Sequence, residues 1–578
     1  MDAHMSVAQR PLDVEPDAHR GPGSPDGSPD RVPTVALSTR RSDLARLANE
    51  RWDVLVVGGG ITGCGILLDA ASRGLRAALI ERDDIAVGTS SRSSRLVHGG
   101  LRYLEQMQLG IVREALRERR LLLQIAPHLV RLRPFLFPLY GGPLTRPFYG
   151  TGLSIYDLLG AGAGGGMHHY LSVADALVDV PVLRRPRLRG AFVYHDGQMD
   201  DARYAVSVLR TAQASGGLAL TRVRALSGVE NGSAMDGCVA RDELSGDEFV
   251  IRASGVIDAT GVWSGRADGP FPSPLGRPVR PSRGTHIVVD KDRIPSRAGL
   301  TLRIPHRVCF LVPLPDRWLI GTTDQEDSGS PDRPRPTLAE VDTILANVNA
   351  SLDVNLTRAD VNGAITGLRP LARDPGGSSG STVSASREHR IRTEANGLVR
   401  ITGGKFTTYR LMAAQTVDAL LGSGRAKALP SVTSELPIVG AASSASLQAL
   451  AGDLVQSSGL DRPRAERIVA RYGTQASDVI ALGCALGLLR PLGPTIDQIE
   501  AEVVWAVREE HALSVDDVLT RRLRLAELLR DRGAAIAPRV AELMARELGW
   551  TSAQERQEID TFLASAHREF DVPTGDAQ

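Results

Sequence analysis

The sequence predicts an α/β fold in which a Rossmann-like dinucleotide-binding domain is combined with a mixed-sheet substrate domain and an all-helical C-terminal cap. Three observations carry this prediction: a glycine-rich turn at 58–63, recurring short strand-like runs in the middle third, and helical composition from about 436 onward. A chain of 578 residues is also too long for a single hydrophobic core, so two or three structural units are expected.

The expected units begin and end where the composition changes. Residues 1–48 carry clusters of Pro, Gly, Ser and Asp, which cannot bury enough apolar surface to become ordered, so a disordered tail is expected there. A helical C-terminal domain is expected at 436–578. The dinucleotide-binding domain is expected to interleave with the substrate domain within 49–435, the first at about 49–130, 190–270 and 360–435, the second at about 131–190 and 271–360.

A βαβ unit opens the expected dinucleotide-binding domain. Residues 53–57 form a short, β-branched apolar run of the kind found in buried parallel strands. A helical pattern follows from Ile61 to about Arg73, and Gly74 is placed to end that helix. A second apolar run at 77–80 predicts the next parallel strand.

Later segments predict the remaining elements. Residues 105–123 are rich in Leu, Arg and Glu and favour a helix, whereas 131–190 are irregular. A strand–turn–helix pattern recurs at 398–405 and beyond. Short strand-like runs in the middle third indicate a mixed or antiparallel sheet, and they lie at 193–194, 256–257, 286–289, 308–312 and 318–320.

The bulk composition is ordinary for a soluble globular protein and argues against several functions. The net charge is +1 and aromatic residues make up 4%, so neither a basic field nor a stacking platform points to nucleic acid. The cysteines are far apart in sequence (Cys64, Cys238, Cys309 and Cys484), which argues against a metal site or a disulfide framework. The sequence has no apolar run of about 18 residues, so no membrane-spanning helix is expected. Its N-terminus lacks the apolar core of a signal peptide.

The turn Gly58-x-Gly60-x-x-Gly63 has the spacing of a pyrophosphate-binding site. Its glycines allow a tight turn, close approach to phosphate oxygens and close packing of the helix on the strand. The helix that begins at Ile61 directs free N–H groups and its positive end at the negative charge. Glu81 follows Gly63 by 18 residues and ends the second strand, where a carboxylate can accept hydrogen bonds from ribose hydroxyls. The turn by itself leaves FAD and NAD open.

A hydroxyl-rich block after Glu81 favours FAD. Residues 89–105 resemble the TSSxSSKLxHGGLRYLE signature of the FAD-dependent (aerobic, respiratory) glycerol-3-phosphate dehydrogenases, with Arg95 where the family usually has Lys. Asp258 departs from the family's NATGxW block. The resemblance covers roughly residues 50–565, with further matching blocks at 194–203, 258–263, 283–289, 320–324, 367–371, 386–389, 402–410 and 502–522.

The resemblance implies a flavin-binding fold of the glucose-oxidase and amino-acid-oxidase type with FAD as cofactor and no metal. His98 is expected to pack beside the flavin rather than react. The residues expected to contact FAD are Gly58, Gly60, Ile61, Thr62, Gly63, Glu81, Thr89, Ser90, Ser91, Ser94, Leu96, His98, Gly99, Gly100, Ala259, Thr260, Gly261, Gly403, Gly404, Lys405, Phe406 and Thr407.

The resemblance also implies oxidation of sn-glycerol 3-phosphate to dihydroxyacetone phosphate. Cations are needed to hold this small dianion, and the candidates are Arg102, Arg369, Arg387 and Lys405. His286 is the candidate proton acceptor, because an unperturbed pKa near 6.5 suits proton transfer at neutral pH; a structural or substrate-positioning role for it stays open. The expected catalytic set is His286, Arg369 and Lys405.

The family passes its electrons to a membrane quinone, which implies a cytoplasmic protein held on the inner face of the plasma membrane. The candidate contact is the segment 146–159, which mixes aromatic residues, leucines and Arg146, and an ordinary buried helix there stays equally open. Other functions also remain open: a glycerol-3-phosphate oxidase that uses O₂, an amine oxidase on the same fold, and a flavin-binding protein without turnover. Homodimerisation is likewise left open.

Overall fold

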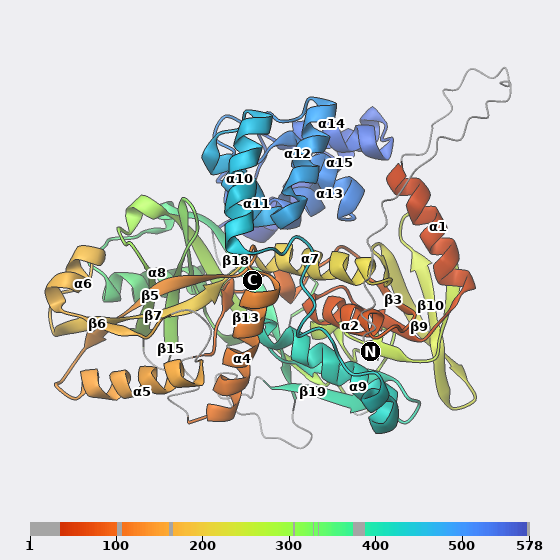
Figure 1. Ribbon diagram of the computed structural model, residues 1–578, viewed down its shortest axis with the longest axis horizontal. Helices are drawn as coiled ribbons and strands as arrows, with labels where there is room; N and C mark the ends of the chain where they lie inside the picture. Colours follow the sequence, from red (N-terminus) through yellow and green to blue (C-terminus); the bar gives the residue numbers. More distant parts are fainter. Residues whose placement is uncertain are drawn as a thin grey trace, which may run out of the picture. The chain divides into compact units, whose positions relative to one another are not determined.

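Three β-sheets and the helices around them make up the described part of the chain (Figure 1). The computed structural model describes residues 35–100, 107–160, 166–274, 276–304, 307–327, 329–332, 334–373 and 388–574. The predicted architecture is confirmed: a parallel sheet built on a βαβ unit, a mixed sheet and a helical C-terminal part.

The six-stranded sheet contains the predicted βαβ unit. Strand β2 (Val54–Val57) leads through helix α2 (Ile61–Ser72) to β3 (Ala77–Ile80), and the two strands pair in parallel. All eight strand residues are buried, as expected for a parallel sheet covered on both faces. The sheet order is β19 (His389–Thr393), β20 (Val399–Gly403), β12 (Val256–Asp258), β2, β3 and β8 (Leu218–Leu220).

Helices pack on this sheet through a shared apolar core. Helix α2 contacts α7 (Asp201–Ala214) and α9 (Tyr409–Ala428). Gly65 of α2 permits the approach of α9, since a Cβ there would lie 2.8 Å from the Tyr409 ring. A second, four-stranded sheet has the order β1 (Arg51–Trp52), β11 (Glu248–Ala253), β10 (Ala234–Asp242) and β9 (Val223–Asn231).

The largest sheet of the described part has ten strands and contains most of the strands from the middle of the chain. Its long antiparallel pair is β13 (Val279–Asp290) with β18 (Val361–Ala372), in which His286 pairs with Ile365. The remaining strands of this sheet are β4 (Leu96–Val97), β5 (Arg131–Tyr140), β6 (His169–Leu171), β7 (Leu188–Gln198), β14 (Gly299–Ile304), β15 (Arg307–Pro313), β16 (Arg317–Gly321) and β17 (Gln325–Glu326).

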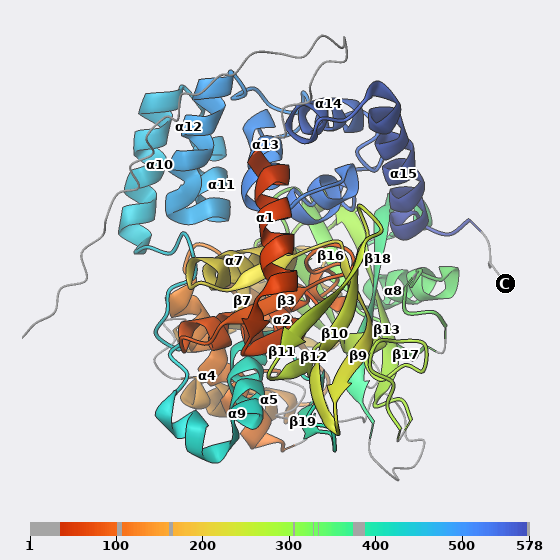
Figure 2. The same cartoon turned by 90° about the vertical axis from the view of Figure 1, so that its right-hand side faces the viewer.

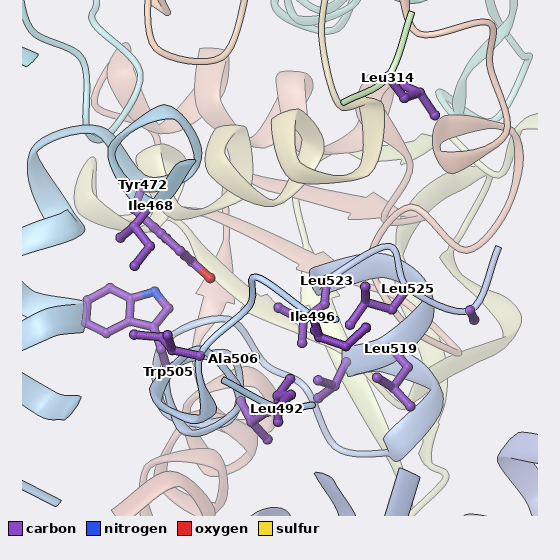
Figure 3. Close-up of a cluster of buried hydrophobic side chains, with 14 of the residues drawn as sticks. Leu314, Ile468, Tyr472, Leu492, Ile496, Trp505, Ala506, Leu519, Leu523 and Leu525 are labelled. Atoms are coloured by element: carbon purple, nitrogen blue, oxygen red, sulfur yellow. The ribbon is translucent and has the colours of Figure 1, made fainter. Parts of the chain in front are cut away.

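Helices α10 to α15 form the C-terminal part and gather on one side in Figure 1. Their apolar core includes Tyr472, Trp505 and Leu519 (Figure 3) and continues into the large sheet through Phe135 and Tyr194. The elements are α10 (Ser444–Ser458), α11 (Arg462–Tyr472), α12 (Ala476–Leu486), α13 (Glu500–Glu509), the π-helix η7 (Asp517–Arg522), α14 (Ala537–Leu548) and α15 (Ser552–Phe570).

Two segments differ from the sequence-based expectation. The disordered tail was expected to reach residue 48, but Val35–Asn49 form helix α1, which passes beside β11 and α13 (Figure 2). Leu47 of α1 is fully buried and Arg40 bonds to Asp242, and such contacts with distant residues are invisible to local composition. The irregular region 131–190 contains β5, β6, α6 (Val173–Asp179) and α5 (Thr145–Leu159).

Candidate functional site

A cavity of about 610 Å³ lies where the six-stranded sheet meets the large sheet. Its walls come from the carboxyl ends of β2 and β3, from β13 and β18, and from three short helices: η1 (Thr89–Ser91), η2 (Gly261–Trp263) and η5 (Phe406–Thr408). Ligands of open α/β sheets bind at the carboxyl ends of the strands.

The glycine turn is shaped for close approach of a ligand to the backbone. Gly58 has φ +114°, and a Cβ there would lie 2.7 Å from the carbonyl oxygen of Ala259. A Cβ at Gly63 would lie 1.9 Å from the carbonyl oxygen of Gly58, so this glycine sets the spacing between helix and turn. The Ile61 N–H, at the start of α2, donates to Ser90 Oγ at 2.9 Å. These features fit a pyrophosphate group at the helix N-terminus.

Glu81 lies at the end of β3, against the same cavity. Its Oε2 accepts from the Gly59 N–H at 2.6 Å and its Oε1 accepts from the Asp83 N–H at 2.9 Å. Burial raises the pKa of Glu81, while these two backbone donors lower it. Each carboxylate oxygen keeps a second lone pair, so the group can also accept from ribose hydroxyls.

The other end of the cavity contains a pair of glycines that precede η5. Gly403 and Gly404 have φ +78° and +88°, and a Cβ at Gly404 would lie 2.4 Å from the Met412 side chain. Lys405, the N-cap of η5, lines the cavity. Positive-φ glycines at both ends, a helix N-terminus and an acidic strand end together fit an elongated dinucleotide such as FAD.

His286 is buried on β13 and lines the cavity. Its Nε2 is hydrogen-bonded to Ser94 Oγ at 2.8 Å, and its Nδ1 has no hydrogen-bond partner among the described residues. Burial, together with the positive charges of Arg369 and Arg95, lowers the pKa of His286 to about 3. The ring is therefore neutral at neutral pH, but its basicity is far below that of the free imidazole on which the sequence-based choice of His286 rested.

Arg369 lies on β18, across from Ser282 of β13, and lines the cavity beside His286. Its Nη2 donates to Thr322 Oγ1 and to the Thr323 carbonyl oxygen, both at 3.1 Å, and its Nη1 lies 3.7 Å from Asp324 Oδ1. These contacts hold the guanidinium at the cavity wall. Two further predicted cations, Arg102 and Arg387, lie outside the described residues.

The structure brings most of the predicted FAD-contacting residues to this cavity, and four of them lie behind its wall. Gly63 packs against the turn and Ser91 offers its carbonyl oxygen to Arg524. The Gly99 N–H donates to Tyr156 Oη at 2.8 Å. Gly100, with φ +81°, is buried beside it. These four therefore support the cavity instead of lining it.

Several lining residues were not anticipated. Gly284 and Gly367 are paired across β13 and β18, and a Cβ at Gly284 would lie 2.3 Å from Arg369 Nη2. A Cβ at Gly367 would lie 2.8 Å from the Cβ of Arg92, another lining residue. Both glycines lie in blocks already matched to the family, so a search for glycines on facing strands would have identified them.

Asp258, the departure from the NATGxW block, has a charged partner. Its Oδ1 accepts from the N–H and hydroxyl of Thr260 at 3.0 and 2.5 Å. Its Oδ2 accepts from Ser264 Oγ at 2.9 Å and from Arg400 Nη1. Arg400 is itself buried and lies 2.9 Å from Glu394. The extra negative charge in this turn is thus balanced by an arginine from β20.

Comparisons with known proteins agree with this geometry. Residues 53–415 match the model of the FAD dependent oxidoreductase family, and residues 431–555 match the C-terminal domain of alpha-glycerophosphate oxidase. Glycerol-3-phosphate dehydrogenase 2 of Mycobacterium tuberculosis is 40% identical over 551 residues, covering 94% of this chain and 93% of its own. The mitochondrial glycerol-3-phosphate dehydrogenase of Mus musculus is 37% identical, covering 90% and 74%.

A solved structure extends the similarity to three dimensions. The glycerol-3-phosphate dehydrogenase from Bacillus halodurans, complexed with FAD, has a TM-score of 0.74 and 26% identity, and covers 93% of this chain and 99% of its own. Both the sequence matches and the structural match extend across the flavin-binding and helical parts. The chain therefore belongs to the family of FAD-dependent glycerol-3-phosphate dehydrogenases.

Proposed function

We propose that the chain oxidises sn-glycerol 3-phosphate to dihydroxyacetone phosphate and passes the electrons to a membrane quinone. The observation that carries the proposal is the meeting of His286 and two cationic side chains, Arg369 and Lys405, on the wall of one cavity. A dianionic three-carbon substrate needs such cations, and an alcohol to be oxidised needs a proton acceptor.

Each residue has a distinct role in this proposal. FAD, when bound, supplies the acceptor for the hydride that leaves C2 of the substrate. His286 takes the proton of the C2 hydroxyl, and its hydrogen bond to Ser94 Oγ holds the orientation of the ring. Arg369 binds the phosphate with a guanidinium already oriented by Thr322 and Thr323. Lys405 adds positive charge on the same side.

The test is an anaerobic titration of the purified, flavin-loaded protein with sn-glycerol 3-phosphate. We expect loss of the oxidised flavin absorbance and reduction of an artificial dye. An unchanged oxidised spectrum would refute the proposal and leave the amine oxidase and the flavin-binding protein without turnover. Peroxide formed under air in proportion to substrate consumed would instead assign the oxidase reaction.

Variants at the cavity separate turnover from cofactor binding. We expect His286→Asn to retain FAD and to lose about 100-fold or more in kcat, because general acid–base catalysis typically supplies that much. Arg369→Met should retain FAD and raise KM strongly. Arg373→Met is the matched control, since Arg373 lies one residue after the end of β18 and is not among the cavity-lining residues.

Delivery of electrons to a membrane quinone requires a surface that meets the membrane, and we assign it to α5. Leu144, Phe148 and Leu158 are 78%, 64% and 76% exposed on this helix and the residue before it. Tyr149 and Tyr156 cover the opposite face and are buried. An apolar exposed face on an amphipathic helix suits the interfacial region of a bilayer. No helix in the described ranges is long and apolar enough to cross one.

Co-sedimentation with vesicles of phosphatidylglycerol and phosphatidylcholine tests this surface. We expect the holoenzyme to bind, and the pair Phe148→Ser and Leu158→Ser to remove most of that binding without changing dye reduction in solution. Leu244→Ser is the control, because Leu244 is also exposed (53%) but lies in the turn after β10. Equal binding by all variants would rule out α5 as the contact.

A further inference from the structure

A short stretch of the C-terminal helical part, residues 521–527, contacts a segment that borders the cofactor cavity. The segment 84–95 runs along the cavity and includes the lining residues Val87, Ser90 and Ser94. Its carbonyl oxygens and side chains meet three arginines: Arg521 and Arg522, which lie in the π-helix η7, and Arg524, which follows it. π-Helical turns are rare and are frequently found at functional sites.

Arg524 makes the contact nearest to the catalytic groups. Its Nη2 donates to the Ser91 carbonyl oxygen at 2.8 Å and lies 3.2 Å from Asp201 Oδ1. Its Nε lies 2.9 Å from Glu527 Oε1. The side chain is buried, and its backbone φ is +62°, a conformation that costs free energy for a residue other than glycine. Strain at a buried arginine with two carboxylate partners indicates that the surrounding structure fixes its position.

The two carboxylates bound to Arg524 hold the segment on either side of Ser94. Asp201 Oδ2 accepts from the N–H and the hydroxyl of Ser93 at 2.9 and 2.7 Å. Glu527 Oε1 accepts from Nη2 of Arg95. Ser93 and Arg95 are in turn joined, since the Arg95 N–H donates to Ser93 Oγ at 3.0 Å.

We propose that Arg524 is a positioning residue of the reaction, holding Ser91–Arg95 so that Ser94 Oγ stays against His286 Nε2. This inference rests on the proposed role of His286. Through Asp201 and Glu527 the guanidinium controls both neighbours of Ser94, so its removal frees the hydroxyl that orients the imidazole. A displacement of about 1 Å at a catalytic group can cost about 100-fold in rate.

The test compares Arg524→Met, Arg524→Lys and Arg467→Met as flavin-loaded holoenzymes. Arg467 is the control because it forms an equally close pair with Glu502, at 3.0 and 2.5 Å, inside the helical part and away from the cavity. The readouts are kcat per bound flavin, KM for sn-glycerol 3-phosphate, and the flavin absorption spectrum.

We expect Arg524→Met to lower kcat per bound flavin about 30- to 100-fold with KM changed less than threefold, Arg524→Lys to recover part of the loss, and Arg467→Met to keep wild-type kcat. Equal losses in Arg524→Met and Arg467→Met, or a loss explained by missing flavin, would overturn the proposal.

If Arg524→Met does not fold, Glu527→Gln serves in its place and should show the same kcat effect. A wild-type enzyme inactive on this substrate would instead refute the proposed function, which separates the two failures.

Discussion

Arg522 binds Asp84 through both nitrogens of its fork, with Nη1–Oδ2 2.8 Å and Nη2–Oδ1 2.7 Å, across 438 residues of sequence. The two side chains are 0% and 1% exposed. Burial opposes ionisation of Asp84, but the guanidiniums of Arg522 and Arg521 hold its pKa below the usual range. The carboxylate of Asp84, which directly follows the Asp83 whose N–H binds Glu81, is thus fixed by the C-terminal helical part.

Removal of one partner of this pair should destabilise the protein strongly. We expect Arg522→Met to lower the free energy of unfolding by about 3–5 kcal/mol, because it leaves a buried carboxylate without its main counter-charge. Denaturant unfolding of the holoenzyme measures the change. Arg508→Met is the control: its bidentate pair with Glu547 is partly exposed and should contribute at most about 1 kcal/mol. Similar losses in both variants would contradict this account.

The glycine turn predicts a contrast between two Gly→Ala substitutions. Gly63→Ala places a Cβ 1.9 Å from the Gly58 carbonyl oxygen, so the helix must move away from the turn, and we expect FAD affinity to fall by about tenfold or more. Gly452→Ala, in the open on helix α10, should retain FAD and raise stability by about 1 kcal/mol. Flavin fluorescence during ultrafiltration checks both, and retention of FAD by Gly63→Ala would be inconsistent with the packing described.

Asp258→Asn tests the charged departure in the η2 turn. The new amide can keep its oxygen on Thr260, but its NH₂ group then faces Ser264 and the guanidinium of Arg400. We expect a loss of about 3 kcal/mol in unfolding free energy with the flavin spectrum unchanged. The control Asp342→Asn breaks an exposed pair with Arg358 and should change stability by less than about 1 kcal/mol. An Asp258→Asn variant with the unfolding free energy of the wild type would show that the pair with Arg400 adds no net stability.

Acid should lower the stability of the fold, because Glu510 becomes protonated and loses its ion pair with Arg203. Burial opposes its ionisation, but the Arg203 guanidinium, at 2.5 and 2.6 Å, holds the pKa of Glu510 at about 2. A carboxylate with a depressed folded-state pKa contributes stability that is complete above its unfolded pKa, near 4.5, and is lost as the pH falls toward 2. The contribution is about 3 kcal/mol.

Urea unfolding measured at pH 6 and at successive values down to pH 2.5 follows this loss. We expect Glu510→Gln to be less stable at pH 6 and to show a shallower decline, since the substituted side chain does not titrate. Glu509→Gln is the neighbouring control, because Glu509 is largely exposed and its pair with Arg210 is 3.3 Å. The same pH slope in wild type and Glu510→Gln would exclude Glu510 as the group responsible.

Local pattern was sufficient for the features that depend on local geometry. The turn from Gly58 to Gly63 and the carboxylate of Glu81 follow from spacing, because strand, turn and helix are contiguous. The contact of Ser94 with His286 joins residues 192 apart, and that of Arg524 with Ser91 joins residues 433 apart. No periodicity in the sequence reports such pairs, so tertiary packing decided them.

The same limit explains the segments that were misjudged. Helix α1 has little amphipathic character, so its sequence pattern does not predict it. Its order comes from tertiary contacts: Leu47 is buried, and Arg40 donates to the Thr221 carbonyl oxygen and to Asp242. Strand β5 was missed because Pro134 and Pro138 interrupt its pattern, although both positions are accommodated in pairing with β7. The predicted roles of Arg102 and Arg387 stay predictions.

The contact between Arg524 and Ser91 also joins two segments that are synthesised at very different times. The βαβ unit and the 84–95 segment are made early, whereas the guanidiniums that hold this segment come more than 400 residues later. A nascent chain halted before residue 521 carries Asp84 and Asp201 without the guanidiniums of Arg521, Arg522 and Arg524 that pair with them. Capture of the flavin by a newly made chain in its final geometry must therefore wait until nearly the whole polypeptide has emerged.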